Sequence, residues 1–233
     1  MSQHTPHVVI LTGAGISKES GIPTFREMNG LWQQFKIEEV ATPEAWINNK
    51  QAVLNFYNYR RKLLKEVQPN TAHYALAELE KTYPVHIITQ NVDDLHERAG
   101  SRNVLHLHGE LKKVRSEKNP ELIYPWENDL HIGDKAEDGE QLRPHIVWFG
   151  EPVPAMEEAA KITRQADIFM IIGTSMQVYP AAGLIFELKS GVPVFYIDPY
   201  PAPIQTSNPL HIIARPATIG VPEAIQMMNE RYA

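Results

Sequence analysis

An apolar run, His7 to Leu11, leads directly into Gly13-Ala14-Gly15-Ile16-Ser17-Lys18-Glu19-Ser20-Gly21-Ile22-Pro23-Thr24-Phe25-Arg26. A buried strand that breaks into glycines and then into a helix is how α/β proteins bind a dinucleotide. The glycines let the backbone approach a pyrophosphate, and the N–H groups at the helix start carry partial positive charge. This segment therefore predicts a dinucleotide site in an α/β fold.

The glycine spacing differs from the fingerprint of dehydrogenases. A G-x-G-x-x-G motif that starts at Gly13 has its third glycine at position 18, where this chain has Lys18. No acidic residue ends a second apolar strand about 20 residues further on, where that fingerprint binds ribose. The sequence therefore predicts a dinucleotide that is not used as a hydride carrier.

Composition excludes several classes of protein. The net charge of -6 argues against a nucleic-acid-binding surface, which is normally basic. The chain has no cysteine, which excludes disulfides, a thiolate nucleophile and sulfur-ligated zinc, and which fits a reducing compartment. No apolar run approaches the length of a membrane span, and residues 1–6 lack the basic start of a signal peptide. We expect a cytoplasmic protein that binds neither membranes nor nucleic acid.

Hydrophobic periodicity predicts the fold class. Short apolar runs predict buried strands at 8–11, 85–89, 104–107, 145–149, 168–172 and 192–197, and helical patterns occur at 72–83, 156–165 and 181–190. Buried strands that alternate with helices indicate a Rossmann-like, mostly parallel sheet with helices on both faces. Two stretches, a helical one at 43–67 and a polar one at 116–143, interrupt this alternation and predict a smaller inserted module.

We expect residues 1–233 to form one domain of three parts. The Rossmann-like core is expected at about 1–26, 84–112 and 143–233, a helical insertion at about 27–83, and the small module at about 113–142.

Polar residues follow three of the predicted strands. Gln90-Asn91-Val92-Asp93 can read a carboxamide such as nicotinamide, or it can simply cap the helix that starts at Leu95. Gly173-Thr174-Ser175 can donate hydrogen bonds to ribose or phosphate, or it can be an ordinary turn.

His106 and His108 end another predicted strand, immediately before Gly109. Residues i and i+2 of a strand point the same way, so the two histidines can chelate a metal. One of them can instead act as a general base near neutral pH, or both can be half-buried residues without a role. Gly109 allows a ligand to approach the backbone closely, which favours a site.

Taken together, these segments resemble the sirtuins, a family of NAD-dependent protein-lysine deacylases. The matching motifs occur in family order over nearly the whole chain: Gly13-Ala14-Gly15-Ile16-Ser17, Gly21-Ile22-Pro23-Thr24-Phe25-Arg26, Thr89-Gln90-Asn91-Val92-Asp93, His106-Leu107-His108-Gly109, Val147-Trp148-Phe149-Gly150-Glu151, and Gly173-Thr174-Ser175 with Val178 and Pro180. The resemblance implies that NAD is consumed to give free lysine, nicotinamide and an O-acyl-ADP-ribose. His108 would be the general base on a ribose hydroxyl, and Asn91 would position the nicotinamide together with Asp93.

The resemblance also implies the binding residues. Those for NAD would be Gly13, Ala14, Gly15, Ser17, Phe25, Arg26, Trp32, Gln90, Asn91, Asp93, Gly173, Thr174, Ser175, Asp198 and Ala217. Those for the acylated lysine peptide would be Tyr57, Arg60, Val147, Trp148, Phe149, Gly150 and Glu151. The loop from Ile22 to Trp32 would close over NAD, and the peptide would add as a short strand beside 147–151.

Tyr57 and Arg60 narrow the expected substrate. They are three residues apart within a predicted helix and share one face, where a guanidinium beside a phenol can bind a carboxylate. In the sirtuin class that this chain resembles, a Tyr-x-x-Arg pair reads the terminal carboxylate of succinyl-, malonyl- or glutaryl-lysine. The alternative is that Tyr57 is a core residue and Arg60 is solvated.

Two departures from the family pattern concern the metal and the acyl tunnel. Sirtuins usually hold a structural zinc with four cysteines, which this chain lacks, so no metal is expected, and Tyr124, Pro125 and Trp126 would pack in that place. Met28 lies near the expected tunnel, where it would narrow the space for long acyl groups. Two alternative functions remain open, mono-ADP-ribosyl transfer and a His-x-His metallohydrolase.

Overall fold

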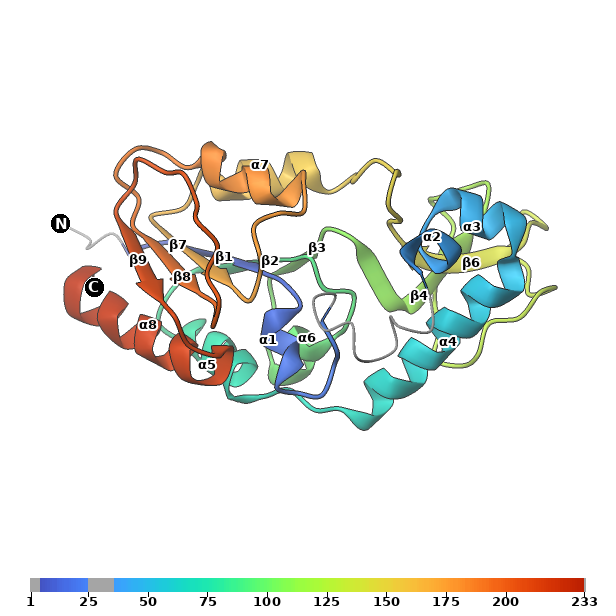
Figure 1. The fold of residues 1–233 in the computed structure, drawn as a ribbon, viewed down its shortest axis with the longest axis horizontal. Coiled ribbons are helices and arrows are strands. Elements are labelled where there is room, and N and C mark those ends of the chain that lie inside the picture. Colours follow the sequence, from blue (N-terminus) through green and yellow to red (C-terminus); the bar gives the residue numbers. More distant parts are fainter. Residues whose placement is uncertain (1–4, 25–35, 233) are drawn as a thin grey trace.

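The structure is a computed structural model that describes residues 5–24 and 36–232. Its larger lobe is built on a six-stranded parallel sheet with the strand order β3-β2-β1-β7-β8-β9 (Figure 1). The strands are β1 (Val8–Thr12), β2 (Val85–Thr89), β3 (Val104–His106), β7 (Ile168–Ile172), β8 (Val194–Ile197) and β9 (Leu210–Ile213). The order reverses between β1 and β7, which is the position where such sheets bind ligands.

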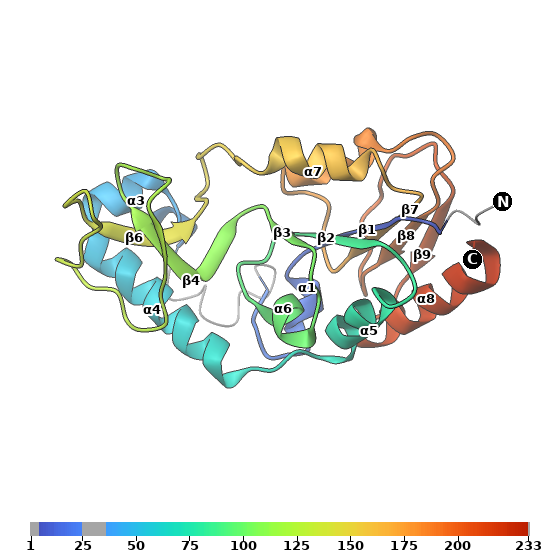
Figure 2. The same cartoon turned by 180° about the vertical axis from the view of Figure 1, so that it is seen from behind.

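Helices cover both faces of this sheet. The side chains of Val8 and Ile10 pack with α5 (Thr71–Leu79) and α8 (Ala217–Tyr232), whereas Val9 and Leu11 pack with α7 (Met156–Thr163) and the 3-10 helix η2 (Ala181–Glu187). Figures 1 and 2 show α7 on one side of the sheet, and α5 and α8 on the other. Every residue of β1 is buried, because alternate side chains enter two different cores.

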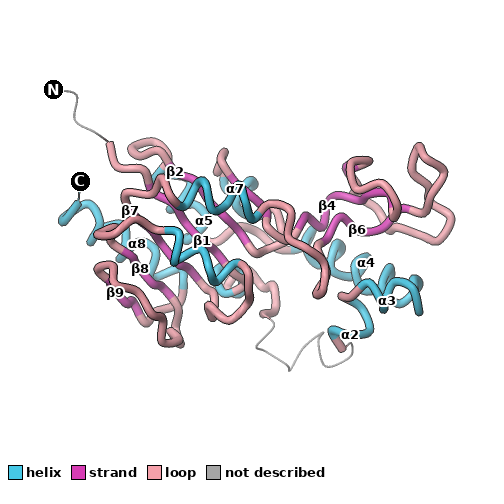
Figure 3. The backbone as a smooth tube through the Cα atoms, turned by 90° about the horizontal axis from the view of Figure 1, so that it is seen from above, coloured by secondary structure: helices cyan, strands magenta, loops and turns pink. Residues whose placement is uncertain are grey.

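A second lobe has its own sheet and its own core. Its antiparallel strands lie in the order β5-β4-β6. Figure 3 shows the helices α2, α3 and α4 grouped with β4 and β6 at one end of the molecule. The elements of this lobe are β4 (Gly109–Ser116), β5 (Ile123–Pro125), β6 (Leu142–Ile146), α2 (Ile37–Val40), α3 (Pro43–Asn48) and α4 (Lys50–Glu66). Two short helices, α1 (Gly15–Lys18) and α6 (Leu95–Ala99), follow β1 and β2 of the large sheet.

Polar side chains fix α4 to the second sheet. Asn49 caps the start of the helix by accepting a hydrogen bond from Ala52 N. The Asn58 side-chain amide makes two hydrogen bonds with the main chain of Leu130. Its Nδ2 donates to Leu130 O at 3.0 Å, and its Oδ1 accepts from Leu130 N at 2.9 Å. The buried guanidinium of Arg61 donates to the carbonyl oxygens of Leu111 and Asn128. These contacts hold α4, and with it the buried Tyr57, in a fixed orientation against the core of the second lobe.

The predicted fold class is confirmed, with one strand assigned wrongly. Residues 145–149 were expected to form a strand of the parallel sheet, but β6 covers Leu142–Ile146 and pairs antiparallel with β4. A short apolar run predicts burial without identifying the partner strand. Trp148 is buried in the core of the second lobe instead. The division of the chain into the three expected parts stays a prediction. No helix in the described ranges is long and apolar enough to cross a membrane.

Candidate active site

Loops from three parallel strands meet at the carboxyl edge of the large sheet. The amide of Gly13 donates to Ile172 O at 3.0 Å, and that of Gly15 donates to Gly173 O at 2.8 Å. Gln90 N donates to Thr12 O at 2.9 Å. The loops after β1, β2 and β7 are therefore hydrogen-bonded to one another, as the sequence predicts for ligand-binding strand ends.

Two glycines are required by close contact of these loops. A Cβ atom on Gly15 would lie 2.6 Å from Gly173 Cα. A Cβ atom on Gly173, whose φ is +61°, would lie 2.4 Å from Ile16 N. At these two glycines backbone packs against backbone, which leaves no space for a side chain. This arrangement fits a pyrophosphate that approaches the backbone closely at this turn.

Asn91 is held by four hydrogen bonds. Its Nδ2 donates to Gly13 O at 3.1 Å and to Ser17 Oγ at 3.3 Å. Its backbone N donates to Thr89 Oγ1 at 3.0 Å, and its carbonyl accepts from His106 Nδ1 at 3.0 Å. The side chain is buried, so these bonds fix both its position and the direction of its amide.

Both carboxylate oxygens of Asp93 accept hydrogen bonds within the protein. One accepts from Leu95 N at 3.2 Å, at the start of α6, and the other accepts from Ser17 Oγ at 3.0 Å. Burial raises the pKa of Asp93, and these two donors oppose the rise. The carboxylate therefore links the start of α6 to α1 beside Asn91. Its expected contact with nicotinamide stays a prediction.

The two histidines have different environments. The Nδ1 of His108 donates to Gln90 O at 3.1 Å, which makes Nε2 the basic atom of the ring. Burial lowers the pKa of His108, so the ring is neutral near pH 7. Burial also lowers the pKa of His106. The Glu97 carboxylate, whose Oε1 lies 2.6 Å from His106 Nε2, raises this pKa by more, so the net shift is upward.

A metal shared by these histidines is not favoured. Both rings use Nδ1 on neighbouring carbonyls, and the second nitrogen of His106 is paired with Glu97. Within residues 5–24 and 36–232, no three histidine, aspartate or glutamate side chains are grouped to hold a metal ion.

The remaining predicted NAD residues lie along the same edge or just beyond it. Gln90 Nε2 donates to Thr174 Oγ1 at 3.1 Å, and Tyr196 OH donates to the Thr174 carbonyl at 3.0 Å. Ser175 follows Thr174 and is partly exposed. Asp198 follows β8, and its Oδ1 accepts from Tyr200 N at 2.8 Å. Ala217 starts α8 and is buried, whereas Phe25, Arg26 and Trp32 lie outside the described residues.

The structure brings together two predicted substrate segments that are far apart in the sequence. The indole Nε1 of Trp148 donates to the phenol oxygen of Tyr57 at 3.0 Å. Burial raises the pKa of Tyr57 to about 12, so the phenol stays protonated at neutral pH. The guanidinium carbon of Arg60 lies 5.9 Å from the centroid of the Tyr57 ring. Burial lowers the pKa of Arg60, while Tyr57 and Asp93 act in the opposite direction, which places Arg60 within electrostatic reach of the strand-end loops.

A buried ion pair supports the segment 147–151. Arg143 binds Glu151 through both nitrogens, at 2.7 and 3.1 Å, and its guanidinium carbon lies 3.4 Å from the Trp148 ring centroid. Glu151 also accepts from Trp148 N at 2.8 Å. Burial would raise the pKa of Glu151, but the hydrogen bond and charge of Arg143 lower it overall. The Glu151 carboxylate therefore binds Arg143 and the main chain of Trp148 within the protein.

The main chain of this segment bridges the two lobes. Val147 N donates to His108 O at 2.9 Å, and Phe149 N donates to Ala41 O at 3.0 Å. Gly150 has a φ of +90°, and the Phe149 side chain is exposed. The segment thus runs directly beside the histidine motif.

Sequence reasoning missed several residues that position this site. Thr12, Thr89, His96 and Glu97 hold Asn91 directly or through another residue, and Arg143 holds Trp148. The spacing Asp93-Asp94-Leu95-His96-Glu97 carries a usable signal. Polar residues one helical turn after a strand end lie close to that strand end again. Arg143 carries no such signal.

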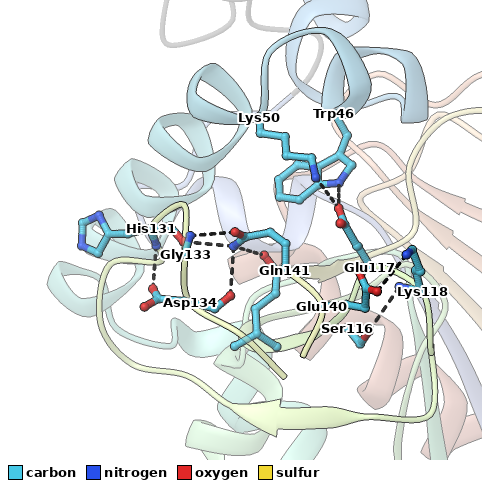
Figure 4. Close-up of polar contacts among 11 residues, drawn as sticks. Trp46, Lys50, Ser116, Glu117, Lys118, His131, Gly133, Asp134, Glu140 and Gln141 are labelled. Carbon is cyan, nitrogen blue, oxygen red and sulfur yellow. Dashed lines mark hydrogen bonds and ion pairs between the residues drawn. The ribbon is translucent and has the colours of Figure 1, made fainter. Parts of the chain in front are cut away.

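The excursion between β4 and β6 does not fit a zinc site with four cysteines, because the chain has none. Side-chain hydrogen bonds close it instead (Figure 4). The Gln141 amide bonds four main-chain groups, those of His131, Gly133, Asp134 and its neighbour Leu142. Ser116 Oγ donates to Asp138 Oδ2, and Glu117 accepts from Trp46 and Lys50.

The expectation that Tyr124, Pro125 and Trp126 pack in the place of zinc stays a prediction. Tyr124 and Trp126 pack against the core of the second lobe, and Pro125 ends β5 opposite Lys113.

The family model described as Sir2 family matches residues 13–180, and the chain belongs to this family. It is 62% identical over 193 residues to a Helicobacter pylori protein named NAD-dependent protein deacylase, and the match covers 83% of this chain and 84% of that protein. A Bacteroides thetaiotaomicron protein of the same name is 52% identical over 228 residues, 95% of this chain and 97% of that one. The solved structure of a Sir2 homolog–NAD complex is 38% identical with a TM-score of 0.85, and the match covers 99% of this chain and 92% of that one.

Proposed function

We propose that this protein is an NAD-dependent protein-lysine deacylase that also removes acidic acyl groups such as succinyl and malonyl. The observation that carries the proposal is the environment of His108. Its Nδ1 is engaged by Gln90, so its Nε2 is available as a base beside the buried Asn91 and Asp93. Membership of the Sir2 family and the named relatives support the same reaction.

The strand-end loops would hold NAD. The main chain of Gly13 to Ser17 and the turn at Gly173 to Ser175 would bind the pyrophosphate and ribose, with Gln90 connecting the two loops. Asp198 and Ala217 would lie toward the adenosine end, and Phe25, Arg26 and Trp32 would cover the ligand. Bound NAD supplies an electrophilic ribose carbon with nicotinamide as leaving group.

The residues of the chain would divide the remaining work. Asn91 and Asp93 would orient the nicotinamide ring, and the four hydrogen bonds of Asn91 mean that little reorientation is needed. His108 Nε2 would accept the proton of a ribose hydroxyl, and its lowered pKa keeps it unprotonated near neutral pH.

The acylated lysine would lie between the 147–151 segment and α4. The amide N–H groups of Val147, Trp148, Phe149 and Glu151 already donate within the chain. A substrate strand would therefore be held by donating its own N–H groups to carbonyls of this segment, which gives little sequence selectivity. Tyr57 and Arg60 would bind the carboxylate at the end of a succinyl or malonyl chain.

Mass spectrometry of acetyl-, succinyl- and malonyl-lysine peptides, with and without NAD, tests this function. We expect loss of the acyl group only with NAD, with one O-acyl-ADP-ribose formed for each lysine released. Peptides that gain ADP-ribose instead would indicate mono-ADP-ribosyl transfer, and NAD-independent activity that chelators abolish would indicate a metallohydrolase. The cytoplasmic location expected from composition stays a prediction.

A further inference from the structure

Trp148 determines the direction of the hydrogen bond at Tyr57. The indole Nε1 lies 3.0 Å from the phenol oxygen. An indole N–H can only donate, so the phenol oxygen is the acceptor in this bond. The phenol hydrogen must then point elsewhere. In the part of the chain that the structure describes, no residue accepts it.

The indole is held so that it cannot turn away from Tyr57. Its ring lies against the Arg143 guanidinium at 3.4 Å from the centroid, and its backbone N is bound by Glu151. The Trp46 ring packs against it at 5.7 Å between centroids. Trp148 is 2% exposed and Tyr57 is also 2% exposed, so water does not readily replace the bond.

We propose that Trp148 is a positioning residue for acyl-chain selectivity. By keeping the Tyr57 oxygen as an acceptor, it directs the phenol hydrogen toward a carboxylate oxygen at the end of the substrate acyl chain. This inference rests on the proposed function, in which Tyr57 and Arg60 read that carboxylate. A carboxylate is an acceptor only and pairs with the free phenol hydrogen, whereas the methyl group of an acetyl chain cannot.

The physical reason is that a buried donor without an acceptor is unfavourable. An acidic acyl chain satisfies the phenol, and an acetyl chain leaves it unsatisfied. Without the indole, nothing fixes the direction of the phenol hydrogen, and the distinction between the two substrates becomes weaker.

The test is Trp148→Phe, which keeps a ring against Arg143 but removes the N–H donor. We expect kcat/KM for a succinyl-lysine peptide to fall about tenfold, through a higher KM with kcat unchanged. The fall for the acetyl-lysine peptide should be clearly smaller, so that the ratio of the two kcat/KM values decreases. Trp46→Phe is the matched control, because that indole belongs to the same cluster but donates to Glu117. It should leave both substrates unaffected.

A double variant tests whether the effect passes through the phenol. Trp148→Phe should cause no further loss of succinyl preference in a Tyr57→Phe background. Equal losses on both peptides, or the same loss in Trp46→Phe, would overturn the inference. A wild-type enzyme that prefers succinyl and keeps this preference in Trp148→Phe would overturn it while the proposed function stands. A wild type without any preference would refute the acidic-acyl function itself, and this inference with it.

A second measurement applies if Trp148→Phe does not fold. In wild-type protein labelled with ¹⁵N-tryptophan, the Trp148 indole signal, assigned through Tyr57→Phe, should move further on binding of a succinyl-lysine peptide than of an acetyl-lysine peptide. Equal displacement by both peptides would overturn the inference.

Discussion

The imidazole Nε2 of His106 lies 2.6 Å from the Glu97 carboxylate, and the opposite nitrogen of the ring donates to the carbonyl of Asn91. Burial lowers the pKa of His106, but Glu97 raises it overall, and the pKa of Glu97 falls correspondingly because His106 offsets the effect of burial. The pair is therefore an ion pair at mildly acidic pH, and through the hydrogen bond of His106 Nδ1 it holds the carbonyl of Asn91 in place.

Glu97→Gln should weaken this support. Because the His106 pKa is raised, its stabilising contribution is fully present below about 6.5, the ordinary value, and is lost as pH rises through the raised value. The Glu97 pKa is lowered, so its contribution is lost as the pH falls below about 4.5. We expect the difference in melting temperature between wild type and Glu97→Gln to be largest near pH 5 to 6 and to shrink toward pH 9, as thermal scans across pH can measure. A difference that grows toward pH 9 would contradict the ion pair.

His108→Ala should abolish deacylation while NAD binding remains. The side chain contacts the protein through one hydrogen bond to Gln90, so its loss removes the base without removing the strand-end loops. We expect kcat to fall at least about 100-fold, which is the usual lower limit for a general base. Calorimetric titration with NAD serves as the control. Retained turnover would exclude His108 as the base.

Arg60→Met should reduce desuccinylation far more than deacetylation, because only the succinyl chain offers a carboxylate to the guanidinium. A charge-assisted hydrogen bond contributes about 1.5–3 kcal/mol, so a loss of about 10- to 100-fold in kcat/KM is expected for the succinyl peptide. Lys62→Met is the control on the same helix, since Lys62 is paired with Asp129. The prediction fails if both peptides lose activity equally.

Gly173→Ala should weaken NAD binding through a steric clash. The added Cβ would lie 2.4 Å from Ile16 N and would push the β7 loop away from α1. Gly191→Ala is the matched control, because Gly191 also has a positive φ, +87°, but has no atom within 4 Å of its Cβ position. Both variants incur the left-handed penalty of about 1–2 kcal/mol. Only Gly173→Ala should raise the Kd for NAD, as measured by titration.

Two buried histidines should make the protein sensitive to acid. Burial lowers the pKa of His73 to about 4 and that of His96 well below its ordinary value. Both are neutral in the folded protein, so stability is full above about pH 6.5 and falls as the pH drops toward the folded-state values, by about 1.4 kcal/mol per pH unit for each group. Urea unfolding between pH 7 and 4.5 measures this slope. His96→Gln should flatten it, and an unchanged slope would show that His96 does not contribute.

Much of this architecture follows from local sequence. The continuous apolar strand Val8–Thr12 and the glycines after it predict the parallel sheet and its ligand edge, because full burial and close backbone approach each require particular residue types. Residues 145–149 show the limit of this reasoning. An apolar run there predicts burial, but the pairing of β6 with β4 depends on a chain excursion that returns from far along the sequence.

The functional residues likewise divide into those that local sequence predicts and those that depend on distant contacts. Tyr57 and Trp148 were each predicted as substrate residues from their own motifs, but the hydrogen bond between them joins positions 91 residues apart. Arg143 was not predicted, because its function depends on the Trp148 ring that it covers. Motifs identify groups that carry chemistry, whereas the residues that orient those groups are recognised only from tertiary contacts.

The Gln141 amide closes the excursion between β4 and β6 with oxygen and nitrogen atoms. In this region the resemblance to sirtuins leads us to expect zinc-binding sulfur, but the chain has no cysteine. Thiolates are open to peroxide and to displacement of their metal, whereas an amide is not oxidised under these conditions. The second lobe should therefore keep its shape during oxidative stress and metal starvation. A deacylase built in this way would respond to the supply of NAD and acylated protein, and not through oxidation of its own thiols, since it has none.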